Sequence, residues 1–309
     1  MTDLDRTERA LPWLDQRTRW ALAAAVVVAV ALAATASNSI LTALDAVILG
    51  AVEGITEFLP ISSTGHLIVT ERLLDLGNGT TKTATDTYTV AIQLGAILAV
   101  VAIYRTHIAA MTRGLLGRDR DGLRLVQLLA IAFVPAAVVG LALDNTIKAH
   151  LFGMWPVITA WTVGGVFLLL WKPGTGSTGL GQITYRHAAI IGSAQVLALW
   201  PGTSRSLVTI AAALAIGLTA TAAVEFSFLL GLITLTAATA LDLAKHGPDL
   251  IDQFGLATPT LGALVAAITA ALAVAWFVDY LRTRSLALFG WYRLAAAATG
   301  VALLATGRI

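Results

Sequence analysis

The sequence predicts an all-α polytopic membrane protein, on two observations. Of its 309 residues, 57% are hydrophobic and only 12% are charged, and the mean hydropathy is +0.81. A soluble domain carries about 25% charged residues, so this chain has too few to cover a wetted surface. The apolar residues also fall into blocks long enough to cross the ~30 Å hydrocarbon core of a bilayer. Both observations argue against a water-soluble globular enzyme.

The apolar blocks are the candidate transmembrane segments. They lie at about residues 20–37, 88–104, 125–143, 156–171, 226–243, 257–278 and 287–306. The first block and the charged tail before it resemble a signal peptide that ends at Ala34-Thr35-Ala36. Because the tail is long and of mixed charge, we expect an uncleaved anchor. Residues 1–39 are therefore a cytoplasmic tail with one extra N-terminal transmembrane helix, and residues 40–309 are the main membrane domain.

Two further apolar stretches, about 40–69 and 187–220, are broken at their middles. The break in the first is Leu59-Pro60-Ile61-Ser62-Ser63-Thr64-Gly65, and the break in the second is Trp200-Pro201-Gly202-Thr203-Ser204-Arg205-Ser206. Proline removes a backbone donor and ends a helix. A broken backbone at membrane depth survives only where protein or water satisfies its polar groups. We therefore expect two re-entrant helical hairpins, each entering and leaving the membrane by one face.

The distribution of Lys and Arg orients these segments. With the N-terminal tail inside, thirteen Lys and Arg residues face the cytoplasm and five face outside, as the positive-inside rule requires. The hairpin 40–69 then enters from outside and the hairpin 187–220 from inside. We expect a multi-pass protein of the plasma (inner) membrane. The net charge of +2 gives no reason to expect a nucleic-acid partner, and the absence of cysteine excludes a Cys nucleophile.

The two halves of the main domain resemble each other. Segment 48–53 aligns with 190–195 at an offset of 142, and after a one-residue gap Ser63 aligns with Ser204. Each half then contains one hairpin and three spans, and because three is odd the second half is inverted relative to the first. The two repeats cover about 40–171 and 187–306. An inverted repeat whose broken helices meet near the midplane is a known way to build a polar site inside a membrane.

Few ionisable residues lie inside the apolar blocks. Each one costs ~2.5–3.5 kcal/mol on the lenient insertion scale, so an intramembrane charge is a functional hypothesis by default. Glu53 and Glu57 are spaced i, i+4, which puts both carboxylates on one helix face. Such an oxygen pair suits a divalent cation, Mg²⁺ or Ca²⁺. The structural alternative is a carboxylate pair that Arg205 neutralises.

The two loops add nucleophiles and an anion site. The first loop supplies hydroxyl groups and a base of near-neutral pKa from Ser62, Ser63, Thr64 and His66. Taken alone, His66 is more often a hydrogen-bonded structural residue. The second loop can hold phosphate oxygens with backbone donors, hydroxyls and a guanidinium from Gly202, Thr203, Ser204, Arg205 and Ser206. Carboxylates, a nucleophile or base, and an anion clamp together indicate phosphoryl-ester hydrolysis.

Other charges in the apolar blocks have structural interpretations. Asp45 and Arg293 lie near block ends, where we expect them to cap a helix or to extend their charged ends to the membrane interface. Glu225 precedes the block 226–243 and is either a functional intramembrane charge or a cap at the start of that helix.

The run Glu53-Gly54-Ile55-Thr56-Glu57-Phe58-Leu59-Pro60-Ile61-Ser62-Ser63-Thr64-Gly65-His66 closely resembles the first signature of the bacterial undecaprenyl-pyrophosphate phosphatases of the bacitracin-resistance type. The run Leu199-Trp200-Pro201-Gly202-Thr203-Ser204-Arg205-Ser206 resembles their second signature. The resemblance covers about 44–309. It implies an inverted-repeat bundle with two re-entrant hairpins that removes the terminal phosphate of a C55 isoprenyl diphosphate. That reaction regenerates the lipid carrier for cell-wall glycans and confers bacitracin resistance.

The resemblance also implies residue roles. Glu53 and Glu57 would serve metal binding and catalysis, and Arg205 would grip the diphosphate. Ser63 and His66 would be the nucleophile-or-base pair, with their division of labour open. The implied partners are a polyprenyl diphosphate lipid and the bilayer, with a homodimer also open, and the active site would face the outer side.

Three positions depart from that family pattern. Leu207 stands where the family usually has Gly, Ala220 where it has Arg, and Ile233 where it has Pro. These changes predict an altered lipid preference or a loss of hydrolysis, and Leu207→Gly is expected to change activity rather than folding. The alternative function is a polyprenyl-phosphate flippase on the same fold, because a carrier needs the anion clamp but not the nucleophile.

Overall fold

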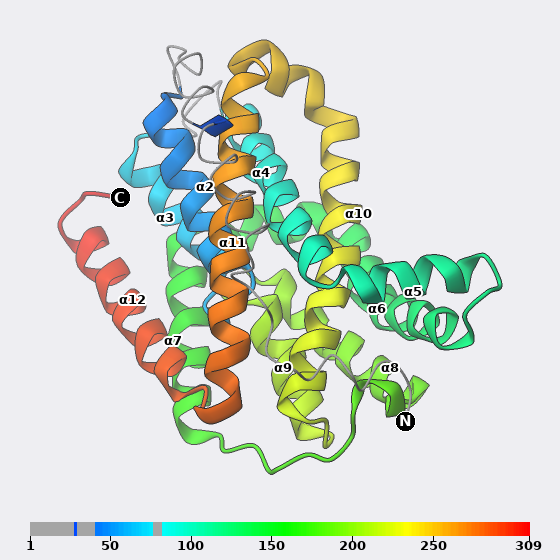
Figure 1. Ribbon diagram of the computed structural model, residues 1–309. Coiled ribbons are helices and arrows are strands. Elements are labelled where there is room, and N and C mark those ends of the chain that lie inside the picture. The colour runs from blue at the N-terminus through cyan, green and yellow to red at the C-terminus, as the bar shows by residue number, and fades with distance from the viewer. Residues whose placement is uncertain (1–27, 30–40, 77–81) are drawn as a thin grey trace.

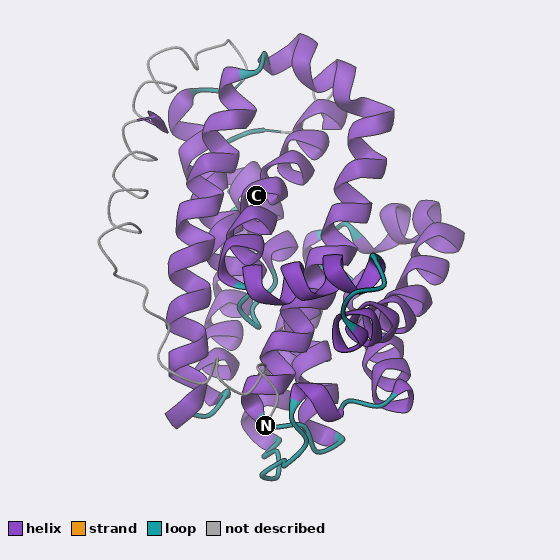
Figure 2. Cartoon of the chain, turned by 45° about the vertical axis from the view of Figure 1, so that its right-hand side comes forward, coloured by secondary structure: helices purple, strands orange, loops and turns teal. Residues whose placement is uncertain are grey.

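The computed structural model describes residues 28–29, 41–76 and 82–309. Over these residues the protein is helical and has no strand (Figure 2). The α-helices are α2 (Ala43–Glu57), α3 (Ser63–Leu73), α4 (Lys82–Ile103), α5 (Arg105–Leu115), α6 (Arg120–Leu151), α7 (Met154–Leu170), α8 (Tyr185–Gln195), α9 (Arg205–Ala215), α10 (Ala220–Phe254), α11 (Ala257–Thr283) and α12 (Ala287–Ala305). The short 3₁₀ helices are η3 (Leu180–Gln182) and η4 (Val196–Leu199). The expected N-terminal transmembrane helix lies outside the described residues, apart from 28–29.

Five of the described helices are long and apolar enough to cross a membrane. These spans are Thr85–Ile103, Arg120–Leu151, Ala220–Phe254, Ala257–Thr283 and Ala287–Ala305. They contain five of the apolar blocks, and the block 156–171 forms the shorter apolar helix α7. The all-α, multi-pass character predicted from composition is therefore confirmed.

The segment 105–124, which connects two of the apolar blocks, is largely helical. It forms α5 and the start of α6, and these two helices pack against each other at the right of Figure 1. Asp119 caps α6 by accepting a hydrogen bond from the Gly122 amide at 2.9 Å. The backbones touch at Gly114 and Gly122, where a Cβ would overlap main-chain atoms of the other helix.

Helix α11 runs in front of α2 and α4 in Figure 1 and packs against both. A Cβ at Gly50 or Gly54 of α2, or at Gly95 of α4, would overlap the α11 backbone. Glycine at these positions therefore lets the helices approach backbone to backbone, as small residues do in membrane bundles. Helix α7 packs against α12, and α4 packs against α10. In Figure 1, α2 and α3 lie in the upper half of the molecule and α8 and α9 in the lower half.

Candidate active site

Each broken apolar stretch folds into two helices joined by a tight loop, and the second helix begins after a serine N-cap. Ser62 precedes α3 with φ 73°, and Ser204 precedes α9 with φ 74°. Each serine Oγ accepts a backbone N–H three residues later, from Gly65 at 3.4 Å and from Leu207 at 3.3 Å. Such caps help to offset the cost of the left-handed backbone. Ser62 and Ser204, which lie 142 residues apart, therefore share a backbone conformation and a capping role, whereas the sequence alignment with its one-residue gap pairs Ser204 with Ser63.

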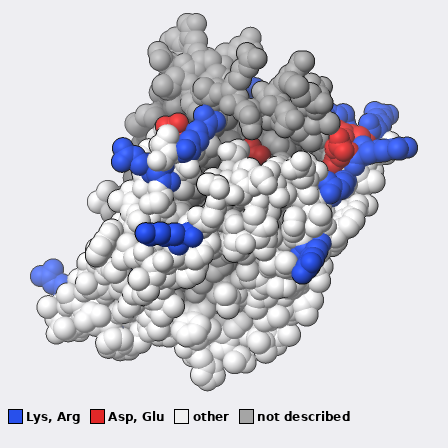
Figure 3. All heavy atoms as spheres, turned by 90° about the horizontal axis from the view of Figure 1, so that it is seen from below, with Lys and Arg blue, Asp and Glu red and all other residues white. Residues whose placement is uncertain are grey.

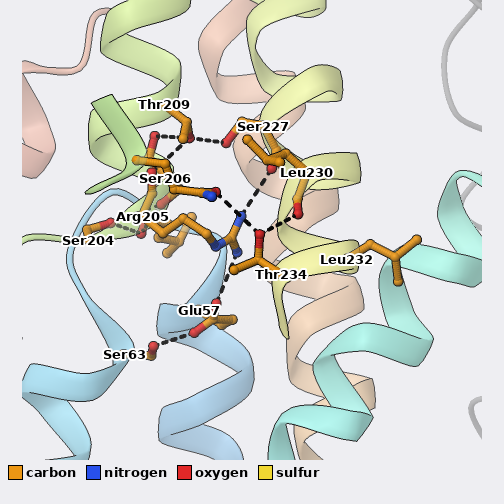
Figure 4. Close-up of polar contacts among 12 residues, drawn as sticks. Glu57, Ser63, Ser204, Arg205, Ser206, Thr209, Ser227, Leu230, Leu232 and Thr234 are labelled. Atoms are coloured by element: carbon orange, nitrogen blue, oxygen red, sulfur yellow. Dashed lines mark hydrogen bonds and ion pairs between the residues drawn. The ribbon is translucent and has the colours of Figure 1, made fainter. Parts of the chain in front are cut away.

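Three residues at the two loops and the end of α2 form one polar cluster (Figure 4). The Ser63 hydroxyl donates a hydrogen bond to Glu57 Oε2, and Arg205 Nη2 lies 3.0 Å from Glu57 Oε1. The side chains of Arg205 and Glu57 are only 10% and 6% exposed. A hydroxyl, a carboxylate and a guanidinium from opposite halves of the chain therefore meet inside the protein.

The Arg205 side chain is held on several sides. Its Nη1 donates to the Ser227 carbonyl of α10 at 3.0 Å, and its guanidinium lies over the Phe58 ring, 5.5 Å from the ring centre. Gly231 leaves room for it, because a Cβ there would overlap the guanidinium. Its Nε–H is buried and has no partner among the described residues. The Nε–H is therefore a donor that could bind an anion.

The two loops bind each other directly. The Ser206 hydroxyl donates to the Leu59 carbonyl at 2.8 Å, and the Ser204 hydroxyl donates to the same oxygen at 3.3 Å. The expected meeting of the loops is therefore present. Both hydroxyls, predicted to hold phosphate, are instead used to join the loops. Thr64 lies in the first turn of α3 and is half-buried.

Glu53 lies one helical turn before Glu57 and is fully buried. Neither of its carboxylate oxygens has a hydrogen-bond partner among the described residues. A buried carboxylate without a partner is costly, so it calls for a proton or a cation. The oxygen donors of Glu53 and Glu57 fit a hard divalent cation. Within the described residues no group of three His, Cys, Asp or Glu side chains gathers, so phosphate oxygens or water would complete the coordination.

His66 does not bind Ser63 in this structure. Its Nδ1 lies 2.7 Å from the Ser62 carbonyl oxygen, and its Nε2 lies 2.8 Å from the Tyr292 hydroxyl. The ring also packs against Trp161. Both ring nitrogens are thus taken, and the expected Ser63–His66 pair is replaced by Ser63–Glu57. Tyr292 was not predicted, because nothing in a sequence links it to a histidine 226 residues away.

Arg293 is also part of this region. It is fully buried, so the expectation that it reaches the membrane interface is wrong. Its guanidinium donates to the carbonyls of Gly202 and Thr203 in the second loop and of Pro60 in the first. The sequence flagged it as an intramembrane charge, and that was the signal that could have identified it.

Residues 46–299 match the family described as bacitracin resistance protein BacA. The chain belongs to the BacA family. An undecaprenyl-diphosphatase of Sorangium cellulosum is 47% identical to it over 262 residues, which are 82% of this chain and 84% of that protein. Undecaprenyl-diphosphatase 2 of Rhodospirillum rubrum is 43% identical over 267 residues, 85% of this chain and 94% of that protein. An undecaprenyl-diphosphatase of Nitrosomonas europaea is 43% identical over 256 residues, with coverages of 81% and 90%.

Leu207 has a structural role in this BacA-family chain. It lies in the first turn of α9 rather than in a loop, and it is 3% exposed within the main apolar core. Leu207→Gly would remove a buried side chain and place glycine in a helix, which costs about 3 kcal/mol or more. The expectation that it would spare folding is therefore wrong.

Two capping predictions have opposite outcomes. Asp45 caps α2 as expected, through reciprocal hydrogen bonds with Thr42. Glu225 does not cap a helix, because α10 begins at Ala220 and the Thr219 side chain caps it. Glu225 and Ala220 both line a small pocket between the ends of α4, α10 and α11.

Proposed function

We propose that this protein is an integral membrane phosphatase that hydrolyses undecaprenyl diphosphate to the monophosphate and inorganic phosphate. The observation that carries this proposal is the contact of Ser63, Glu57 and Arg205 at the meeting of the two loops. The three relatives described above bear the name of this phosphatase. A flippase would need the Arg205 guanidinium to bind phosphate, but it would not need the Ser63–Glu57 pair. We therefore favour hydrolysis over transport. The product would return to cell-wall synthesis as a lipid carrier.

In the first half-reaction, the Ser63 oxygen attacks the terminal phosphorus of the diphosphate. Its proton passes to Glu57, which already accepts the Ser63 hydrogen bond. A bond from the serine oxygen to phosphorus forms while the bond from phosphorus to the bridging oxygen breaks. Undecaprenyl monophosphate leaves, and the phosphoryl group remains on Ser63.

In the second half-reaction, water attacks the phosphorus of the phosphoserine, and the bond from phosphorus to the Ser63 oxygen breaks. Glu57 returns its proton to that oxygen, which restores the Ser63 hydroxyl, and the water proton leaves with the released phosphate. Phosphoryl transfer depends mainly on positioning and charge stabilisation. Arg205 supplies the charge, because its free Nε–H and its Nη groups can bind oxygens of the transferring phosphoryl group. His66, bound to Ser62 and Tyr292, would position the start of α3 rather than take the serine proton.

A divalent cation, Mg²⁺ or Ca²⁺, is part of this proposal. Glu53 and Glu57 would hold it, and the two unpartnered oxygens of Glu53 support the assignment. When bound, the cation would neutralise negative charge on the diphosphate.

We also propose that the main domain is an inverted repeat with two re-entrant hairpins. Helix α2 packs against α11 as α8 packs against α6, and α4 contacts α11 as α10 contacts α6. If α2, α4 and α6 of the first half correspond to α8, α10 and α11 of the second, each of these contacts has its counterpart. The matching backbone at Ser62 and Ser204 supports the same relationship.

The proposed location is the plasma (inner) membrane, with the active site facing the outer side. The lower face in Figure 1 would be cytoplasmic. Seen from below, Lys and Arg side chains lie at several places on that face, and Asp and Glu at fewer (Figure 3). A homodimer also remains a proposal, which the mass of the detergent-solubilised protein would test.

The deciding experiment measures phosphate release from C55 diphosphate by the purified protein, with Ser63→Ala as the matched inactive variant. We expect one phosphate per substrate from the wild type and none from C55 monophosphate. Failure of the folded wild type to release phosphate would refute hydrolysis. Flipping of a polyprenyl phosphate in vesicles by such an inactive protein would revive the transport alternative.

A further inference from the structure

Arg293 of α12 is a buried cation whose hydrogen bonds to the described residues all go to backbone carbonyls. Its side chain is 0% exposed. Its Nη1 donates at 3.2 Å to Pro60 O and to Thr203 O, and its Nη2 donates at 2.8 Å to Gly202 O and at 2.7 Å to Ala160 O. One guanidinium therefore joins the first loop, the second loop and α7.

The carbonyls of Pro60, Gly202 and Thr203 need such a donor. They belong to the loops between helices, so no regular helix pairs them, and unpaired carbonyls at membrane depth cost several kcal/mol each. Arginine carries five N–H donors in a planar fork and stays charged, so a single side chain can serve several carbonyls at once. Space for the fork comes from Gly164, where a Cβ would overlap the guanidinium.

The bound carbonyls lie next to the proposed catalytic groups. Pro60 is three residues before Ser63, and Thr203 is two residues before Arg205. Arg293 thus fixes the backbone that carries the nucleophile relative to the backbone that carries the anion-binding cation. It does so through carbonyls and does not contact the reacting side chains in the hydrogen bonds it makes.

We infer that Arg293 is a positioning residue that holds the two loops of the phosphatase site in register. This inference rests on the proposed function for its catalytic consequence, but the geometric part stands independently. A displacement of about 1 Å between reacting groups can cost ~10²-fold in rate. Lysine cannot replace it, because one ammonium group cannot span carbonyls on three separate segments.

The chain offers a matched pair of variants that leave α12 unchanged. Gly164→Ala places a Cβ against the Arg293 guanidinium and must displace it. Gly165→Ala, the control, disturbs the packing of α7 on α12 at Gly290 and Leu294 without touching the guanidinium. Together with Arg293→Lys, these variants separate the loss of the carbonyl clamp from a general loosening of α7 and α12.

The experiment combines hydrogen–deuterium exchange with steady-state phosphate release. We expect Arg293→Lys and Gly164→Ala to speed exchange in peptides 58–66 and 200–208 and to leave peptides of α10 and α11 unchanged. We also expect kcat to fall by about 10–100-fold, with KM changed much less. Gly165→Ala is expected to keep protected loops and near-normal kcat.

Two outcomes would overturn the inference. In the first, both loops stay protected in Gly164→Ala and turnover is normal. In the second, Gly165→Ala reproduces the full effect, which would make the role one of helix packing. If Arg293→Lys loosens the whole protein, Gly164→Ala alone decides. If the wild type releases no phosphate, the proposed function fails, and loop exchange still decides whether Arg293 positions the loops.

Discussion

Arg205 and Glu57 form a buried ion pair across 148 residues of sequence, with Nη2 3.0 Å from Oε1. A diphosphate that enters the cluster has to compete with Glu57 for the guanidinium. Removing one partner of a buried pair leaves the other charge uncompensated, which costs about 3–5 kcal/mol. Substitutions here therefore affect both catalysis and stability, and each needs a folding control.

Arg205→Ala is expected to lower kcat/KM by roughly 10²–10³-fold, because it removes the charge that stabilises the transferring phosphoryl group. Arg205→Lys is expected to recover little, since an ammonium group cannot bind Glu57 and the Ser227 carbonyl in the same geometry. Steady-state phosphate release measures both. Arg308→Ala, at an exposed position, serves as the control. Near-normal turnover by a folded Arg205→Ala protein would refute the phosphate clamp.

Gly231→Ala is expected to slow turnover without changing any polar group. The added Cβ would occupy the place of the Arg205 guanidinium, so kcat should fall at least ~10-fold. Gly140→Ala is the matched control, because its Cβ would reach only Leu199 at 3.4 Å, an ordinary contact. Phosphate release and thermal unfolding of both variants give the comparison. Equal activities would mean that the position of Arg205 is not critical.

Ser63→Ala is expected to reduce turnover by roughly 10³-fold or more, as the loss of a nucleophile does. Thr70→Ala on the same helix is the control, since its hydroxyl bonds only the His66 carbonyl, at 2.8 Å. Brief reaction with diphosphate labelled at the terminal phosphorus should leave label on the wild type and none on Ser63→Ala. Label on another residue would assign the nucleophile elsewhere.

Chelation by EDTA is expected to abolish phosphate release, and added Mg²⁺ or Ca²⁺ should restore it. Glu53→Gln keeps the side-chain shape but removes the charge, so the cation concentration for half-maximal activity should rise by about 10–100-fold. Titration of each cation into the chelated protein measures this. Unchanged activity in EDTA would show that the unpartnered Glu53 carboxylate carries a proton instead.

Cysteine labelling tests the inverted repeat, and the absence of native cysteine makes every label unambiguous. Arg72→Cys at the end of α3 should react with a membrane-impermeant maleimide in intact cells. Gly174→Cys, between α7 and α8, should react only after permeabilisation, and it is open to labelling because a Cβ there meets no atom within 4 Å. Labelling of both sites from the same side would contradict hairpins that enter from opposite faces.

The spans and the breaks between helices could be predicted because their causes are local. Apolar length fixes a span, and Pro, Gly and Ser in the two loops end one helix and cap the next. The error at Leu207 came from treating the whole second motif as a loop. The Ser204 side chain starts α9 at the next residue, which turns Leu207 inward.

The partners of the site residues were harder to predict because they are distant in the sequence. The i, i+4 spacing correctly predicted that Glu53 and Glu57 lie one turn apart on the same helix. It could not show that Arg205 pairs with Glu57. The Tyr292 and Arg293 contacts depend on how α12 packs against α7, and no local pattern encodes that packing.

The place of Arg293 in the last helix sets an order for biosynthesis. Its partner carbonyl at Pro60 is 233 residues earlier in the chain. At about 5–20 residues per second, the first loop is made roughly 10–50 s before the guanidinium that joins it to the second loop. Nascent chains that lack α12 are therefore expected to be inserted yet inactive, with the two loops not fixed relative to each other. The protein would therefore acquire phosphatase activity only when the C-terminal helix is complete and Arg293 joins the two loops.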